Sequence, residues 1–167
     1  MSDQIGEGRG EVPVQYHQFD IGDEEGPTGP PLDRSSNGLV CVVDGATTVQ
    51  TGIHTGDVHV TVTLHEARPE PDDGDWQEIV EISAHSASGE LMIRSLMADL
   101  DEELPALSFQ GPGHYRLRIH ARGRDTAVDG APDVVTEWYL IQSWPAPTAG
   151  PAVLRLTDRY GAGARAS

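Results

Sequence analysis

The chain has 167 residues, of which 27 are Asp or Glu and 11 are Lys or Arg, so its formal net charge at pH 7 is −16. A charge this negative disfavours direct binding to nucleic acid or anionic membranes and favours basic partners. The single cysteine, Cys41, excludes an internal disulfide. Without a secretory signal or a run of apolar residues long enough to span a bilayer, the sequence predicts a cytoplasmic protein.

Short alternating apolar segments, separated by 19 Gly and 12 Pro, predict an all-β fold, an antiparallel β-sandwich of about eight or nine strands. We expect a flexible N-terminal arm over residues 1–11, a single sandwich domain over residues 12–160 and a disordered tail over residues 161–167. In chain order, the expected strands cover residues 12–21, 39–43, 46–53, 57–65, 76–84, 90–97, 106–109, 113–122, 136–144 and a last segment that begins at Val153.

The expected strand over residues 113–122 concentrates positive charge on one face. Alternation places Tyr115, Leu117, Ile119 and Ala121 toward the core and Arg116, Arg118, His120 and Arg122 on the opposite face. These basic side chains either pair with Glu78, Glu81 or Glu90 on a neighbouring strand or, together with Arg124, bind an anion or an anionic ligand. Residues 122–125, at the strand end, are expected to be the most exposed part.

Acidic residues gather in loops, which display carboxylates to solvent. The candidate partner-binding residues are Asp23, Glu24, Glu25, Asp72, Asp73, Asp75, Asp101, Glu102 and Glu103. Carboxylates on a surface can mimic the phosphates of DNA and accelerate the encounter with a basic protein. The alternative interpretation is that such a surface only keeps the protein soluble.

Catalytic and metal-binding patterns are missing from the sequence. His59 and His65 would lie on one strand face but about 20 Å apart, which is too far to share one ion. The chain has no G-x-S-x-G nucleophile elbow, and without lysine it has no phosphate-binding P-loop. We therefore expect no enzyme activity, no metal and no cofactor.

Four short segments appear in an order typical of one known family. They are Tyr16-His17-Gln18-Phe19, Asp44-Gly45-Ala46, Arg94-Ser95-Leu96-Met97, and residues 107–117 with the sequence LSFQGPGHYRL. In these segments the chain resembles the competence protein J family over about residues 12–143. The resemblance implies a small acidic bacterial protein, and the founding member of that family restrains a DNA-entry nuclease. The chain departs from the pattern in its longer acidic loops, in the arginines at 122–124, and in a C-terminal extension from about Trp144.

The charge and the resemblance lead to one functional prediction and one alternative. We predict an acidic, non-enzymatic binding protein, an inhibitor or immunity-type partner of a nuclease or another basic protein. The alternative is a sandwich that binds a small anionic ligand on a sheet face carrying His59, Arg118, His120 and Trp138.

Overall fold

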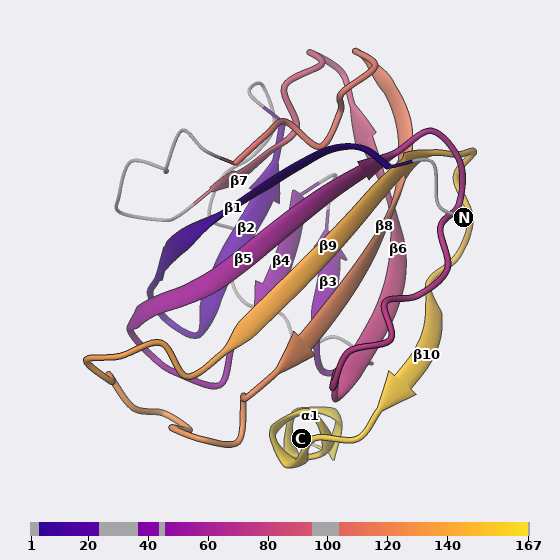
Figure 1. Cartoon of the computed structure of the whole chain (residues 1–167). Helices are drawn as coiled ribbons and strands as arrows, with labels where there is room; N and C mark the ends of the chain where they lie inside the picture. The colour runs from indigo at the N-terminus through magenta and orange to yellow at the C-terminus, as the bar shows by residue number, and fades with distance from the viewer. Residues whose placement is uncertain (1–3, 24–36, 44–45, 95–103, 167) are drawn as a thin grey trace.

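Two β-sheets packed face to face form the body of the protein, as a computed structural model shows for residues 4–23, 37–43, 46–94 and 104–166 (Figure 1). The six-stranded sheet has the order β1 (Gln4–Val14), β5 (Gly56–His65), β9 (Trp138–Pro145), β8 (Gly113–Arg122), β6 (Glu78–Ser86) and β10 (Ala152–Leu156). The four-stranded sheet has the order β3 (Val40–Val43), β4 (Ala46–Gln50), β2 (Gln18–Gly22) and β7 (Met92–Arg94). The predicted β-sandwich is confirmed, with ten strands in the described residues.

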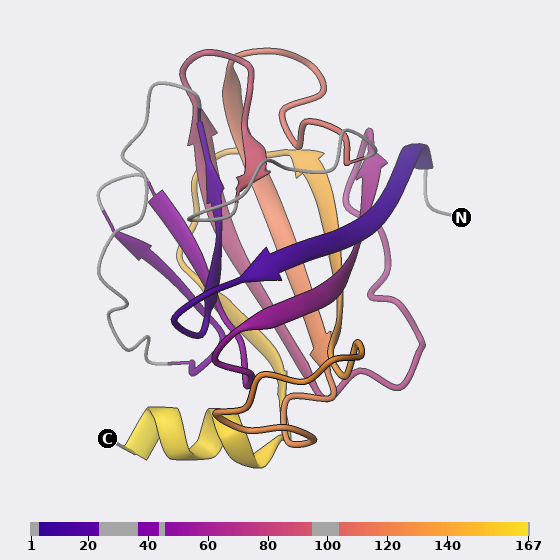
Figure 2. The same ribbon diagram turned by 90° about the vertical axis from the view of Figure 1, so that its left-hand side faces the viewer.

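Alternation of apolar and polar residues explains how the strands bury one face. On β8, Tyr115, Leu117, Ile119 and Ala121 all belong to the buried core, as predicted. On β5, Val58, Val60, Val62 and Leu64 also face inward. They pack against apolar side chains of the smaller sheet, among them Phe19, Ile21, Val49 and Ile93. Figure 2 shows the two layers from the side. The core side chains fill the space between them.

The larger sheet contains one parallel pair among its described strands. β5 and β9 run parallel, with His59 beside Trp138 and Thr63 beside Gln142, whereas the other paired strands are antiparallel. β9 therefore lies between β5 and β8, and its outward side chains stand between the threonines of β5 and the arginines of β8. The face of this sheet turned away from the core is called the outer face below.

Both chain ends differ from the prediction. The expected flexible arm is wrong for residues 4–11, because β1 begins at Gln4 and pairs with β5 along nearly its whole length. The expected disordered tail is wrong for most of residues 161–167, because α1 (Arg159–Ala166) forms there and lies across one end of the sandwich (Figure 2). The expected strand over residues 12–21 is interrupted at residues 15–17, where the chain turns from β1 into β2.

Within the described residues, no helix is long and apolar enough to cross a membrane.

Candidate functional site

Glu81 organises the positive charge on the outer face. It lies directly opposite Arg118 in the pairing of β6 with β8. Arg118 Nε donates to Glu81 Oε2 at 2.9 Å, Arg116 Nε donates to Oε1 at 3.3 Å, and Arg68 donates to both oxygens at 3.0 and 2.8 Å. Burial by itself would raise the pKa of Glu81, but the hydrogen bond and charge of Arg118 and the charge of Arg68 lower it below its ordinary value. One ionised carboxylate thus serves three guanidinium groups.

The inner part of the predicted arginine face is buried and makes most of its contacts within the protein, although Arg118 Nη2 has no hydrogen-bond partner among the described residues. Arg118 is completely buried, stacks on Trp144 at 4.9 Å and donates to Gln142 Oε1 at 2.6 Å and to the carbonyl of Pro69 at 2.9 Å. Arg116 donates to the carbonyls of Ala149 and Gly150. The predicted pairing with glutamates of the neighbouring strand is therefore confirmed for Arg116 and Arg118.

His120 lies beside Arg118 and is also buried. Its Nδ1 lies 3.1 Å from the carbonyl oxygen of Leu140, and its Nε2 accepts a hydrogen bond from the backbone N–H of Asp72 at 3.3 Å. One nitrogen donates and the other accepts, which is the pattern of a neutral imidazole. Burial, supported by the charge of Arg118, lowers the pKa of His120 to about 4. Because the backbone engages both ring nitrogens and the ring is completely buried, His120 offers no N–H group to the anionic ligand of the alternative hypothesis.

Arg122 occupies the outer end of the same strand face. Its guanidinium lies between two indole rings, 5.2 Å from the ring centre of Trp76 and 5.2 Å from that of Trp138. Trp76 is itself held in place, because its Nε1 donates to Asp72 Oδ2 at 2.6 Å. Arg122 thus packs a loop onto the sheet by cation–π contacts.

Arg124 does not belong to this face, and its expected exposure is wrong. It is completely buried, donates to both carboxylate oxygens of Asp158 at 2.7 and 2.9 Å, and also contacts Glu78 at 3.1 Å. Asp125, the next residue, accepts hydrogen bonds from the first backbone N–H groups of α1. The reason is tertiary: the C-terminal segment folds back over this turn and covers it. The five basic residues therefore do not form one open anion site.

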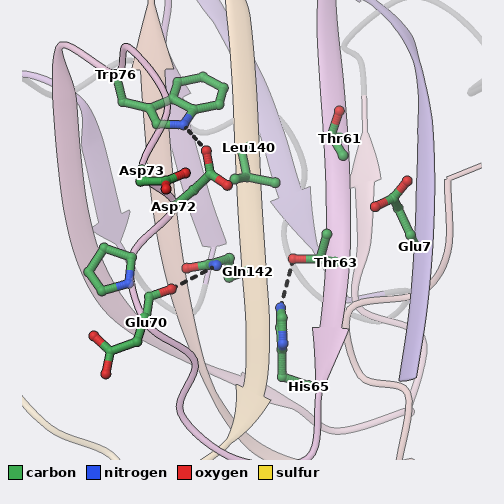
Figure 3. A pocket seen from close by; sticks show the side chains of 11 residues that line it. Glu7, Thr61, Thr63, His65, Glu70, Asp72, Asp73, Trp76, Leu140 and Gln142 are labelled. Carbon is green, nitrogen blue, oxygen red and sulfur yellow. Dashed lines mark hydrogen bonds between the residues drawn. The ribbon is translucent and has the colours of Figure 1, made fainter. Parts of the chain in front are cut away.

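An acidic groove lies next to this basic network on the outer face. It has a volume of about 570 Å³ and runs over β5 and β9, between the loop of residues 66–77 and β1 (Figure 3). The loop contributes Glu70, Asp72 and Asp73, and β1 contributes Glu7 from the opposite side. The loop is held against the sheet by contacts already described at Pro69 and Asp72, and by Gln142 Nε2, which donates to the carbonyl of Glu70 at 3.2 Å.

The floor of the groove consists of uncharged side chains. They are Thr61, Thr63 and His65 of β5 and Leu140 and Gln142 of β9. His65 Nε2 lies 2.8 Å from Thr63 Oγ1, whereas its Nδ1 has no hydrogen-bond partner within the described residues. Burial and the charge of Arg118 lower the pKa of His65 below its ordinary value, so the ring is neutral at pH 7. The groove as a whole therefore carries negative charge at its sides.

The structure separates the nine acidic residues predicted to bind a partner. Asp72 and Asp73 line the groove, and Asp75 is exposed on the same loop. Asp23 is buried instead of displayed: it accepts hydrogen bonds from Ser86 and Ser88, and these lower its pKa although burial by itself would raise it. The remaining predicted residues, Glu24, Glu25, Asp101, Glu102 and Glu103, lie outside the described part of the chain.

Two carboxylates of the groove were missed by sequence reasoning. Glu70 belongs to the acidic loop that was singled out, but only its later residues were chosen. Glu7 lies in β1, where every second residue from Gly6 to Gly10 is glycine and the charged residues Glu7, Arg9 and Glu11 alternate with them. That two-residue period was the available signal for a strand with one charged face.

The arrangement of the groove is suited to binding positively charged groups. Four carboxylates stand around a floor of hydroxyl and amide groups, and two of them already have partners in the protein: Glu7 Oε2 accepts from Arg9 at 2.8 Å and Asp72 Oδ2 accepts from Trp76. Carboxylates in this setting match the donors of lysine or arginine side chains. Within the described residues, no group of three or more His, Cys, Asp or Glu side chains is arranged to hold a metal ion.

Comparisons with known proteins identify the fold. No family model and no curated protein matches the sequence. Among solved structures, ComJ from Bacillus subtilis, described as an inhibitor of the DNA degrading activity of NucA, superposes with a TM-score of 0.61 over 87% of this chain and 99% of ComJ, at 19% identity. A protein described as crocagin biosynthetic gene J superposes with a TM-score of 0.52 over 85% of this chain and 98% of its own, at 13% identity. The chain therefore has the fold of ComJ.

Proposed function

We propose that this protein is a non-enzymatic inhibitor of a nuclease, and that it binds a basic surface of that nuclease through the acidic groove. The fold likeness to ComJ motivates the choice of partner, since ComJ is an inhibitor of a DNA-degrading activity. The observation that carries the proposal is the groove itself, where Glu7, Glu70, Asp72 and Asp73 surround an open space of about 570 Å³.

The proposed mechanism is competition with DNA. A nuclease holds the phosphates of its substrate with basic side chains. Carboxylates at the rim of the groove would pair with those side chains and occupy the positions that phosphates need. The net charge of −16 attracts the basic surface over a long distance and increases the association rate, an effect that salt weakens.

In this proposal the protein acts in the cytoplasm and does not bind nucleic acid directly. Its own charge repels the phosphate backbone, so the protein partner and not the DNA is the target. Fractionation of the source cells, with an antibody against this chain, tests the location; recovery outside the cytoplasm would contradict it.

The experiment that tests the function is a DNA degradation assay. An extract of the source cells is incubated with DNA and with increasing amounts of the purified protein, at low and at high ionic strength. We expect inhibition at low ionic strength and weaker inhibition at high ionic strength. If the wild-type protein leaves the rate of degradation unchanged at both salt concentrations, the proposal is wrong.

Two double variants assign the effect to the groove. In Glu70→Gln/Asp73→Asn the groove loses two charges, and we expect the concentration for half-inhibition to rise about tenfold or more. In the control, Glu66→Gln/Glu90→Gln, the net charge changes equally, but both substituted residues are exposed outside the groove. Equal loss of inhibition in both variants would mean that net charge, not the groove, is responsible.

A further inference from the structure

The turn between β1 and β2 has an unfavourable backbone conformation. Its two central residues, Tyr16 and His17, both have positive φ values, 56° and 64°, and the turn is closed by a hydrogen bond of 3.2 Å from Gln18 N to Gln15 O. Positive φ at both central positions is the geometry of a type I′ turn, which strongly favours Asn-Gly and similar pairs. A tyrosine and a histidine are therefore costly choices at these positions.

The unfavourable backbone conformation of His17 is explained by the contacts that this residue makes inside the protein. Its backbone carbonyl accepts a hydrogen bond from Thr51 N at 2.8 Å, and its ring stacks on Tyr160 of α1 with centroids 5.9 Å apart. Its Nδ1 lies 3.1 Å from the carbonyl of Thr51, and its Nε2 lies 2.9 Å from Asp129 Oδ1. Asp129 is the third non-glycine residue with positive φ, 60°, in the described chain. These contacts hold one end of the sandwich together.

Tyr16 has no comparable role in the fold. Its side chain is 64% exposed, and its one aromatic contact among the described residues is edge-on with His54, at 5.5 Å between ring centres. A strained residue whose side chain contributes little to the core suggests selection for a purpose other than folding. An exposed tyrosine held on a rigid turn is also the kind of residue that dominates binding energy in protein interfaces.

The surroundings of the turn match a basic protein. The strand pair β1 and β5, which ends beside the turn, carries a second hollow of about 310 Å³ that includes Glu11, Asp57 and Asp133. Val134, at the same hollow, is 69% exposed. On the outer face Glu11 pairs with His59 and Glu7 with Thr63, so the same two strands lead from this hollow to the acidic groove. Arg9 lies between Glu7 and Glu11 on this face and donates to Glu7 Oε2 at 2.8 Å. The exposed aromatic residue therefore stands beside the acidic hollow of Glu11, Asp57 and Asp133, at one end of the face that leads to the acidic groove.

We propose that Tyr16 is the anchor residue of the interface with the basic partner: its ring enters an apolar pocket on that protein, while the neighbouring carboxylates pair with basic residues around the pocket. This inference rests on the proposed inhibitory function and adds a second contact region to the groove. In this proposal the backbone strain at Tyr16 is kept for the sake of binding, because a residue that relaxed the turn, such as asparagine, has no aromatic ring.

The test is a substitution that relaxes the backbone and removes the ring. Asparagine tolerates positive φ, so in Tyr16→Asn the Tm is expected to stay unchanged or to rise by about 2 °C. In the extract assay the same variant is expected to need at least about tenfold more protein for half-inhibition. The matched control is Leu154→Asn, since Leu154 is 39% exposed on β10, at the opposite edge of the same sheet.

The possible outcomes separate this inference from the proposed function. A fall in Tm of several degrees in Tyr16→Asn would show that Tyr16 serves folding and would overturn the inference without any use of the partner. Unchanged inhibition by Tyr16→Asn, or an equal loss in Leu154→Asn, would overturn it and leave the inhibitory function intact. Absence of inhibition by the wild-type protein would remove both.

Discussion

Arg118 and Glu81 face each other across β8 and β6, and the guanidinium donates to the carboxylate at 2.9 Å although both side chains are almost completely excluded from water. Charges in such a place cost desolvation energy that only close pairing offsets. Arg116 and Arg68 contact the same carboxylate. Glu81 therefore joins three segments of the chain, namely β6, β8 and the loop of residues 66–77.

Glu81→Gln should therefore be strongly destabilising. The variant keeps the size of the side chain but leaves Arg118 buried without its counter-charge, so we expect the free energy of unfolding to fall by about 3–5 kcal/mol. Chemical denaturation followed by tryptophan fluorescence measures the change. Glu90→Gln, at an exposed glutamate, is the control and should change stability by less than about 0.5 kcal/mol. A loss below about 1 kcal/mol in Glu81→Gln would contradict the dependence on this carboxylate.

Asp158→Asn should release the C-terminal helix. Arg124 is bound by Asp158 at 2.7 Å and by Glu78 at 3.1 Å, and Asp158 also accepts a hydrogen bond from Gly161 N in α1. Glu78 keeps part of the charge balance, so we expect a moderate loss of about 2 kcal/mol. Hydrogen exchange should show faster exchange of the α1 amides than in the wild type, with β5 and β9 little changed. Uniformly faster exchange in all strands would indicate global and not local destabilisation.

His120 should make stability depend on pH. Its pKa is about 4 in the folded protein, below the ordinary 6.5, so the unfolded chain binds the proton more readily. Its stabilising contribution is thus complete above pH 6.5 and is lost as the pH falls toward 4, by about 3 kcal/mol in total.

The comparison with His120→Gln isolates this effect. Glutamine can donate and accept hydrogen bonds without titrating, and the contributions of the carboxylates are common to both proteins. The difference in unfolding free energy between wild type and variant should shrink as the pH falls from 6.5 to 4. A constant difference over that interval would show that His120 does not take up a proton on unfolding.

Gly123→Ala tests the turn after β8. Gly123 has a φ of 90°, and a Cβ atom there would lie 2.1 Å from the carbonyl oxygen of Thr136. The neighbouring atom is backbone and cannot move aside, so we expect a loss of at least about 3 kcal/mol or failure to fold. Gly150→Ala is the control, since a Cβ at Gly150 meets no atom within 4 Å. Near-wild-type thermal unfolding of Gly123→Ala would contradict the geometry.

The sequence predicts the class of fold well because strand alternation is a local property. Tyr115, Leu117, Ile119 and Ala121 face the core as their spacing indicates, and the arginines of the same strand face the other way. The pairing of those arginines with a glutamate was also foreseen, since like charges along one strand face need compensation. Of the four carboxylates at the acidic groove, the sequence predicted Asp72 and Asp73 as binding residues and missed Glu7 and Glu70.

The two chain ends show where local patterns fail. β1 is rich in glycine and α1 contains two glycines, so neither segment has a strong preference of its own. β1 becomes a strand because β5 offers it a partner, and α1 is held by Asp125, Asp158 and the stacking of Tyr160 on His17. Contacts between residues far apart in the chain therefore determine both structures.

By itself the sequence determined the charge of the protein, the alternation that builds its strands and hence a sandwich with a buried core. Tertiary structure alone decided which charged groups remain available. Asp23 and Arg124, expected at the surface, are buried and paired, whereas Glu70, which the sequence prediction left out, is exposed at the acidic groove. The physical reason is that burial and ion pairing depend on what packs against a side chain, and the strands and loops that cover these residues are distant in sequence.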